Sequence, residues 1–133
     1  MDDALAVPLG QAAVRRRGSA LTLVSWSRQA LLCEQACETL ATEGIDVELI
    51  DLRSIWPWDR EKVLTSCSRT GRLLVVHEAV QAAGFGAEIA EVTGCRVRRL
   101  GAPRIPVGYA PVLEAQSRIG VEAIAEAGRT LLR

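Results

Sequence analysis

The chain has 133 residues, of which 49% are hydrophobic, so it is predicted to form one domain over residues 1–133 with its own core. Sixteen basic and sixteen acidic residues cancel, and the one basic run, Arg15–Arg17, is short; this excludes a global field that would attract nucleic acid or an anionic membrane. No apolar stretch approaches the roughly 20 residues that cross a bilayer, and the acidic start Met1–Ala4 lacks signal-peptide features, which predicts a soluble, cytoplasmic protein.

Apolar strand patterns alternate with amphipathic helical patterns along the chain. Ser27 and Asp59 are candidate N-caps, and Gly71 is a candidate helix stop. Three prolines between 103 and 111 predict a stretch without regular structure. The expected elements are a possible edge strand within 7–14, a strand at 21–26, a helix at 27–43, a strand at 47–52, a helix at 59–70, a strand at 72–76, a short helix at 84–92, a strand at 96–100 and a terminal helix at 121–132.

This succession predicts the fold class. Strand–helix–strand repetition places strands parallel to each other, with helices on both faces of the sheet. We therefore expect an α/β protein, a three-layer α/β/α sandwich around a mostly parallel, five-stranded sheet.

The four cysteines, at 33, 37, 67 and 95, are predicted to be core residues. Cys33 and Cys37 are four residues apart in a helical pattern and so share one face, where a free cysteine packs as a small hydrophobe. A zinc site would need closer cysteine pairs or histidine partners, and the only histidine lies far along the chain.

His77, the only histidine, is expected just past the end of the 72–76 strand, where open α/β sheets bind ligands. It could exchange a proton there, or it could bond a neighbouring loop or a partner subunit. Glu78 is adjacent, and adjacent residues of a strand point to opposite faces, so the two are not expected to act as a pair.

Two aromatic segments have both functional and structural interpretations. Gly84-Phe85-Gly86 opens a helix as phosphate-binding loops do, but it lacks the dinucleotide fingerprint and the glycines favour close backbone packing. Trp56 and Trp58 flank a proline, as contact anchors would, or one of them fills space beneath the loop while the other is partly exposed.

A series of short motifs carries a family resemblance over nearly the whole chain. Their order and spacing resemble the C-terminal domain of transketolase-like, thiamine-diphosphate-dependent enzymes. The likeness is greatest to the beta subunit of the decarboxylating component of 2-oxoacid dehydrogenase complexes, which act on 2-oxoisovalerate or pyruvate. The motifs are Val7-Pro8-Leu9-Gly10, Gly44-Ile45-Asp46-Val47, Asp51-Leu52-Arg53, Pro57-Trp58-Asp59, Thr70-Gly71-Arg72, His77-Glu78-Ala79, Gly84-Phe85-Gly86-Ala87-Glu88, residues 106–111 and Leu113-Glu114.

The resemblance implies that the edge strand within 7–14 runs antiparallel to the others. It also implies a domain that builds subunit contacts and supports oxidative decarboxylation of a 2-oxoacid without being catalytic alone, in an oxidoreductase whose thiamine diphosphate and magnesium are held elsewhere. The chain has no Gly-Asp-Gly motif, which binds that cofactor's metal in the family, so this chain alone is expected to bind no cofactor.

The implied partners are the pyrimidine-binding and pyrophosphate-binding domains or subunits of the same enzyme, with the acyltransferase's subunit-binding domain as a further possibility, in a homo- or hetero-oligomer. The chain would be a small subunit of a split enzyme or an excised piece of a beta subunit. The alternatives are a stand-alone docking or regulatory module that kept the fold and lost the enzyme, and a free-standing enzyme that uses His77.

We assign no catalytic, cofactor-binding or metal-binding residue and predict an interface at the carboxyl edge of the sheet. The helix after Gly86 has only about two turns, where the family has more, so nearby apolar surface would be exposed or covered by a partner. The predicted interface residues are His77, Glu78, Phe85, Tyr109, Trp56 and Trp58.

Overall fold

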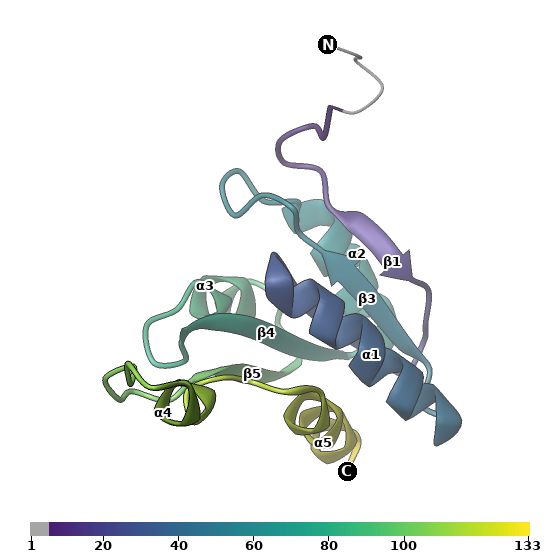
Figure 1. The fold of residues 1–133 in the computed structure, drawn as a ribbon. Helices are drawn as coiled ribbons and strands as arrows, with labels where there is room; N and C mark the ends of the chain where they lie inside the picture. The colour runs from purple at the N-terminus through teal and green to yellow at the C-terminus, as the bar shows by residue number, and fades with distance from the viewer. Residues whose placement is uncertain (1–5) are drawn as a thin grey trace.

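The computed structural model describes residues 6–133, which form a five-stranded sheet in the order β1-β3-β2-β4-β5 (Figure 1). The strands are β1 (Ala13–Arg16), β2 (Leu21–Ser25), β3 (Val47–Asp51), β4 (Arg72–Val80) and β5 (Arg96–Ala102). The helices are α1 (Arg28–Thr42), α2 (Arg60–Thr70), α3 (Gly86–Glu91), α4 (Pro111–Ala115) and α5 (Val121–Leu132). The acidic start Met1–Ala4, used above to argue against a signal peptide, lies outside the described residues.

The predicted sheet is confirmed. β2 pairs in parallel with both β3 and β4, and β4 pairs in parallel with β5. β1 pairs with β3 in the antiparallel direction, as the resemblance implies, although it occupies Ala13–Arg16 and overlaps only the end of the expected segment. The pairing shifts register between Val14 and Arg16, which limits the edge strand to a short ladder.

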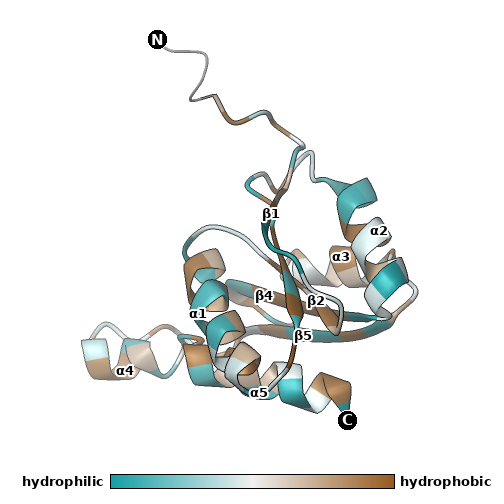
Figure 2. Cartoon of the chain, turned by 90° about the vertical axis from the view of Figure 1, so that its right-hand side faces the viewer, coloured by the Kyte–Doolittle hydropathy of each residue, from teal (hydrophilic) through white to brown (hydrophobic). Residues whose placement is uncertain are grey.

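Three layers follow from the alternation of side chains along the strands, and Figure 2 shows the apolar strands between the helices. Leu23 and Leu74 face α1 and α5, whereas the next residues along these strands, Val24 and Val75, face α2 and α3. Each face of the sheet therefore has its own apolar core, and the α/β/α sandwich is the observed architecture.

Helix ends agree in part with the predicted caps. The Asp59 carboxylate accepts a hydrogen bond from the Lys62 backbone N–H at 3.1 Å, and Gly71 ends α2 with a φ of 68°, so both predictions are confirmed. Ser27 does precede α1, but its side chain makes no capping hydrogen bond and its φ is 56°. Ser27 therefore occupies the predicted N-cap position, but without the side-chain hydrogen bond that a capping serine makes.

Two strands are longer than predicted, and a short helix replaces part of the proline-rich stretch. β4 continues through His77 to Val80 because it keeps its pairing with β5, which brings Val80 opposite Ala102. Pro111 then begins α4, where its fixed φ suits the first helical position and its missing N–H costs nothing. The expectation of no regular structure is wrong there.

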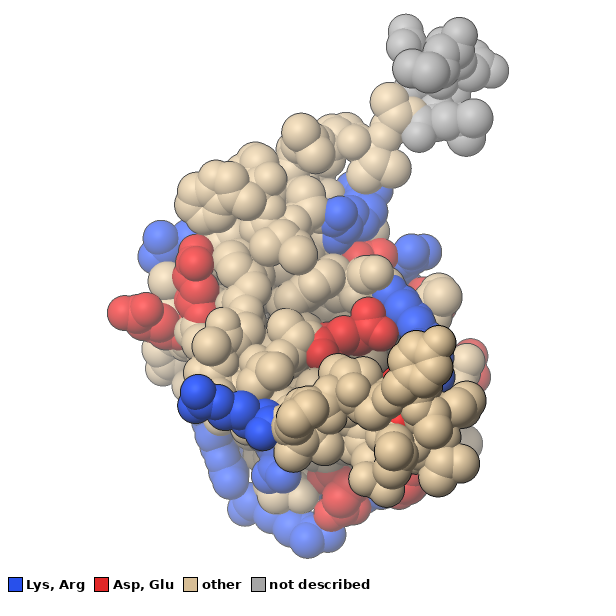
Figure 3. All heavy atoms as spheres, turned by 60° about the vertical axis from the view of Figure 1, so that its left-hand side comes forward, with Lys and Arg blue, Asp and Glu red and all other residues tan. Residues whose placement is uncertain are grey.

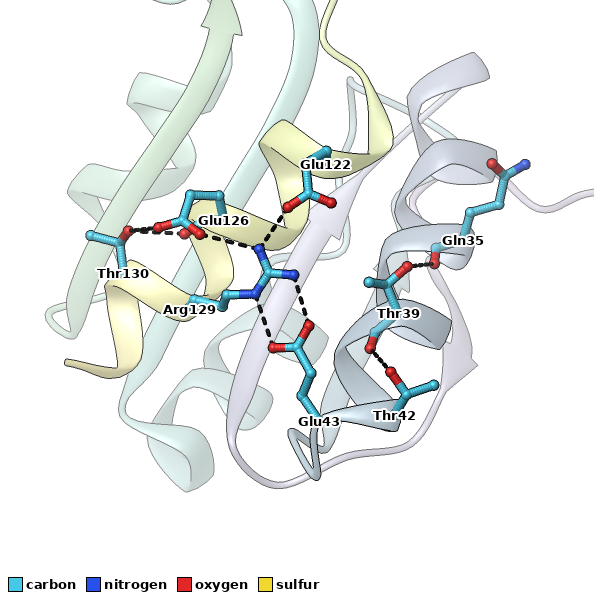
Figure 4. Close-up of polar contacts among 8 residues, drawn as sticks. All are labelled: Gln35, Thr39, Thr42, Glu43, Glu122, Glu126, Arg129 and Thr130. Carbon is cyan, nitrogen blue, oxygen red and sulfur yellow. Dashed lines mark hydrogen bonds and ion pairs between the residues drawn. The ribbon is translucent and has the colours of Figure 1, made fainter.

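Hydrogen bonds from Arg129 link α5 to the end of α1 (Figure 4). Its guanidinium donates two hydrogen bonds to the Glu43 carboxylate, at 2.7 and 2.9 Å, and one to Glu122 at 2.8 Å. A bidentate arginine–carboxylate pair has a defined geometry, so it fixes the position of α5 relative to the end of α1 and adds to the apolar packing between the two helices.

Three of the four cysteines lie in the core, as predicted, whereas Cys95 lies at its edge. Cys33, Cys37 and Cys67 are buried, Cys95 is half-buried, and all four are free thiols. Burial raises the pKa of each of the three buried thiols to about 12. Since the thiolate is the reactive form of cysteine, these three thiols are unreactive at neutral pH.

We expect a thiol-reactive maleimide to label Cys95 first in native buffer. Cys33, Cys37 and Cys67 should react only after denaturant is added, because each is at most 1% exposed. Timed labelling followed by peptide mass spectrometry measures the four rates separately. Fast native labelling of Cys33 and Cys37 would contradict the observed packing of α1 on the sheet.

Within residues 6–133, no helix is long and apolar enough to cross a membrane.

Candidate functional site

The connections between strands diverge at one point of the sheet. β2 leads through α1 to β3 on one side, whereas its neighbour β4 leads through α3 to β5 on the other. The Ser25 hydroxyl donates a hydrogen bond to the Val76 carbonyl at 2.9 Å. This bond links β2 to β4 at the point where the connections that follow the two strands diverge. In open α/β sheets such a switch point, at the carboxyl ends of the strands, is the common place for a ligand or contact site.

His77 lies at this switch point and is buried. Its ring stacks on Trp26, with centroids 5.5 Å apart and planes 19° from parallel. Nδ1–H donates to the Ala79 carbonyl at 3.0 Å, while Nε2 has no hydrogen-bond partner among the described residues. Gly84 and Gly86 lie in close contact with the ring, and a Cβ atom at either position would overlap it.

Burial lowers the pKa of His77, and the hydrogen bond to Ala79 only partly offsets this effect. The imidazole is therefore held neutral and enclosed. The expectation that His77 lies past the strand and presents polar surface is wrong, because β4 carries it into the space between Trp26 and the two glycines. Its role at an interface stays a prediction.

Glu78 points to the opposite face from His77, as strand geometry requires. It is exposed and lies 3.9 Å from the Arg28 guanidinium. His77 and Glu78 therefore do not form an acid–base pair, as expected.

The aromatic residues divide between core and surface. Phe85 is half-buried and packs edge-on against Trp26 and Trp58, with centroids 5.9 and 6.3 Å away. Trp58 is itself half-buried, whereas Trp56 is 75% exposed. One tryptophan thus fills space beneath the loop while the other faces solvent, which was the structural alternative of the two interpretations.

Helix α4 and its flanking residues present apolar side chains to solvent. No residue of α4 is buried, and Tyr109 just before it is fully exposed. α4 lies at the periphery of the fold, and Figure 3 shows that uncharged side chains cover much of this side, around a group of charged side chains in its middle. We call this the α4 surface; its residues are Ile105, Val107, Tyr109, Val112 and Leu113.

Only Tyr109 of the α4 surface was predicted from the sequence. The four missed residues are interspersed with two prolines and a glycine in the printed sequence; they are Ile105, Val107, Val112 and Leu113. A run of apolar residues too broken by proline to build a core element was the signal that could have identified them.

Residues 6–133 contain no group of three His, Cys, Asp or Glu side chains that could hold a metal ion. The exposed end of the sheet offers aromatic and aliphatic surface, which suits contact with protein better than coordination chemistry.

The sheet order, the switch point and the exposed α4 surface define an α/β domain of the doubly wound class. A split-gene transketolase, described as an inactive beta4 tetramer, has the same fold: the alignment covers 99% of this chain and 45% of that one, with a TM-score of 0.87 and 21% identity.

Residues 10–124 match the family described as transketolase, C-terminal domain, and the chain belongs to this family. It is 53% identical over 89 residues to 2-oxoisovalerate dehydrogenase subunit beta 2, mitochondrial, of Arabidopsis thaliana, a match that covers 67% of this chain and 25% of that subunit. It is 34% identical over 131 residues to pyruvate dehydrogenase E1 component subunit beta, mitochondrial, of Dictyostelium discoideum, covering 92% of this chain and 37% of that one. The chain thus spans only about a quarter to two fifths of these relatives.

Proposed function

We propose that the chain is the assembly domain of a decarboxylating 2-oxoacid dehydrogenase component, and that the α4 surface is its contact with the rest of that enzyme. The observation that carries this proposal is α4 itself, a helix without a buried residue and flanked by a fully exposed tyrosine. An exposed apolar patch of this kind marks an interaction site in a folded protein. The 53% identity to a 2-oxoisovalerate dehydrogenase beta subunit supports a branched-chain 2-oxoacid as the substrate of the whole enzyme.

Thiamine diphosphate and magnesium belong, in this proposal, to pyrimidine-binding and pyrophosphate-binding domains or subunits that this chain contacts. The absence of Gly-Asp-Gly from the sequence supports that division, as does the lack of a metal-ligand cluster in residues 6–133. An acyltransferase subunit-binding domain is a further candidate partner. We propose a cytoplasmic location, from the sequence alone; the two relatives above are described as mitochondrial.

We expect calorimetric titration of the isolated chain with magnesium and thiamine diphosphate to give no binding heat. Affinity purification of the tagged chain from its own cells should instead recover chains that carry Gly-Asp-Gly, and the purified assembly should bind the cofactor. Stoichiometric cofactor binding by the chain alone would overturn the proposal.

A stand-alone docking or regulatory module is the second candidate function, because the α4 surface would serve either role. The same purification separates the two. A module that lost the enzyme would recover partners without the Gly-Asp-Gly motif, and the recovered assembly would bind no thiamine diphosphate.

A further inference from the structure

Two cysteines that are distant in the sequence lie together near the end of α2. Cys67 belongs to the last turns of α2, and Cys95 directly precedes β5. The backbone connects their surroundings: the Gly71 N–H donates to the Cys67 carbonyl at 2.8 Å, and the Arg96 N–H donates to the Gly71 carbonyl at 3.2 Å. Both cysteines pack in the same apolar core, on the face of the sheet that α2 and α3 cover. The end of α2 and the start of β5 therefore hold the two residues close to each other.

The two thiols are near enough to influence each other. Burial raises the pKa of the Cys67 thiol, and the charge of Cys95 and a contact with its side chain raise it further. Both residues are free thiols in the structure. A disulfide forms without backbone movement only between side chains that already approach each other. Cys67 and Cys95 meet this condition.

Cys95 is the accessible member of the pair. It is half-buried and follows Gly94, a turn residue with a φ of 61°, whereas Cys67 is 1% exposed. Since oxidation of a thiol depends on solvent access, a dissolved oxidant reaches Cys95 first. The Cys67 thiol is protected from dissolved reagents, but it can react with an oxidised form of the residue beside it. Reaction between groups held in place is much faster than reaction between separate molecules, which offsets the high pKa of Cys67.

Cys33 and Cys37 are also neighbours, and they provide a contrast. The charge of Cys37 contributes to the raised pKa of Cys33, yet both residues are at most 1% exposed. They lie four residues apart on α1, and this spacing puts Cβ atoms roughly 5–6 Å apart. A disulfide needs about 3.5–4.5 Å between its Cβ atoms, so the helix backbone keeps this second pair from joining.

We infer that Cys95 is a site of reversible oxidation by hydrogen peroxide, and that Cys67 converts the oxidised residue into a disulfide. In the first step the Cys95 sulfur attacks the peroxide, its O–O bond breaks, and Cys95 becomes a sulfenic acid while one water leaves. In the second step the Cys67 sulfur attacks the Cys95 sulfur. The S–S bond forms, the S–O bond breaks, and the leaving hydroxide takes the Cys67 proton as a second water. Two thiols thus lose two electrons, which one peroxide molecule accepts.

The disulfide would close residues 67–95 into a loop that contains β4, the buried His77 and α3. Such a cross-link stabilises the fold because it restricts the unfolded chain. A small thiol reverses it, so in a compartment that keeps thiols reduced the bond would form only transiently. This site is distinct from the α4 surface and does not depend on the function proposed above.

The inference is tested by treating the full chain with hydrogen peroxide, blocking the free thiols in denaturant and analysing tryptic peptides without reduction. We expect one cross-linked product, which joins peptide 63–69 to peptide 73–96 within a single chain. Peptide 29–53 carries Cys33 and Cys37 and is the internal control, since both of its thiols should be recovered blocked. Dithiothreitol should restore all four thiols, and the oxidised chain should melt at a higher temperature than the reduced chain.

Three variants separate the roles of the thiols. Cys67→Ser should stop at the sulfenic acid, which dimedone traps on Cys95, whereas Cys95→Ser should leave Cys67 reduced. Cys37→Ala is the matched control for loss of a buried thiol, and it should cross-link as the wild type does.

The inference is overturned by a wild type that forms no such cross-link, that links Cys95 only between chains, or that oxidises Cys33 and Cys37 as readily. Oxidation of Cys67 in the Cys95→Ser variant would overturn it too. Thermal melts show whether each variant is folded, and Cys95→Ser, at a half-buried position, decides the outcome if Cys67→Ser is not.

Discussion

Gly84→Ala is expected to lower the free energy of unfolding by about 1–3 kcal/mol, the usual cost of overpacking a filled core. The added Cβ would lie against the His77 ring and 2.8 Å from the Val80 carbonyl oxygen. The ring cannot move away freely, because it is buried and stacked on Trp26. Urea unfolding followed by tryptophan fluorescence measures the change.

A double mutant identifies the cause of this loss. His77→Ala removes the ring that the new methyl group meets, so the double variant should be more stable than the sum of the two single effects predicts. Gly120→Ala is the control: a Cβ there meets nothing within 4 Å, and its cost should stay within about 1 kcal/mol. Additive effects of His77→Ala and Gly84→Ala would show that the clash is not with the imidazole.

The buried His77 also predicts a pH dependence of stability. Burial lowers its pKa in the folded state, so the unfolded chain binds the proton more readily. Stability should therefore be complete above the ordinary histidine pKa of about 6.5 and fall as the pH drops below it. His77 is the only histidine in the chain, so His77→Gln should remove most of this slope between pH 7 and 5.

The elements that local chemistry specifies could be predicted from the sequence. Asp59 and Gly71 bound α2 as expected, because a cap and a left-handed glycine act through neighbouring backbone groups. Cys33 and Cys37 share the buried face of α1 because helical spacing alone puts them there. The layers followed from the alternation of strands and helices.

The errors lie where partners distant in sequence decide the structure. The strand pattern ends at Val76 because the polar His77 and Glu78 follow it, yet pairing with β5 extends β4 to Val80. The burial of His77 depends on Trp26 from β2's end and on two glycines after β4, a combination that no local pattern indicates. The contact of Cys67 with Cys95 is likewise visible only once β5 pairs with β4.

Substitutions on the α4 surface are expected to weaken the association of the chain with itself or with a partner, without changing its thermal stability. Tyr109→Ala and Val112→Ser should each weaken self-association or partner binding by more than about 1 kcal/mol, the threshold of an interface hot spot. Neither side chain is buried in the chain itself, Tyr109 being fully exposed and Val112 77% exposed. Their melting temperatures should therefore stay close to that of the wild type.

Leu31→Ala provides the comparison, since Leu31 is 56% exposed but belongs to α1 and not to the α4 surface. It should leave association unchanged. Sedimentation equilibrium of the wild type and three variants measures self-association, and binding of purified Gly-Asp-Gly-bearing partner chains measures heteromeric contact. A wild type that stays monomeric and binds no such chain would defeat the proposal, because an apolar helix with no buried residue of its own would then have no protein to cover it.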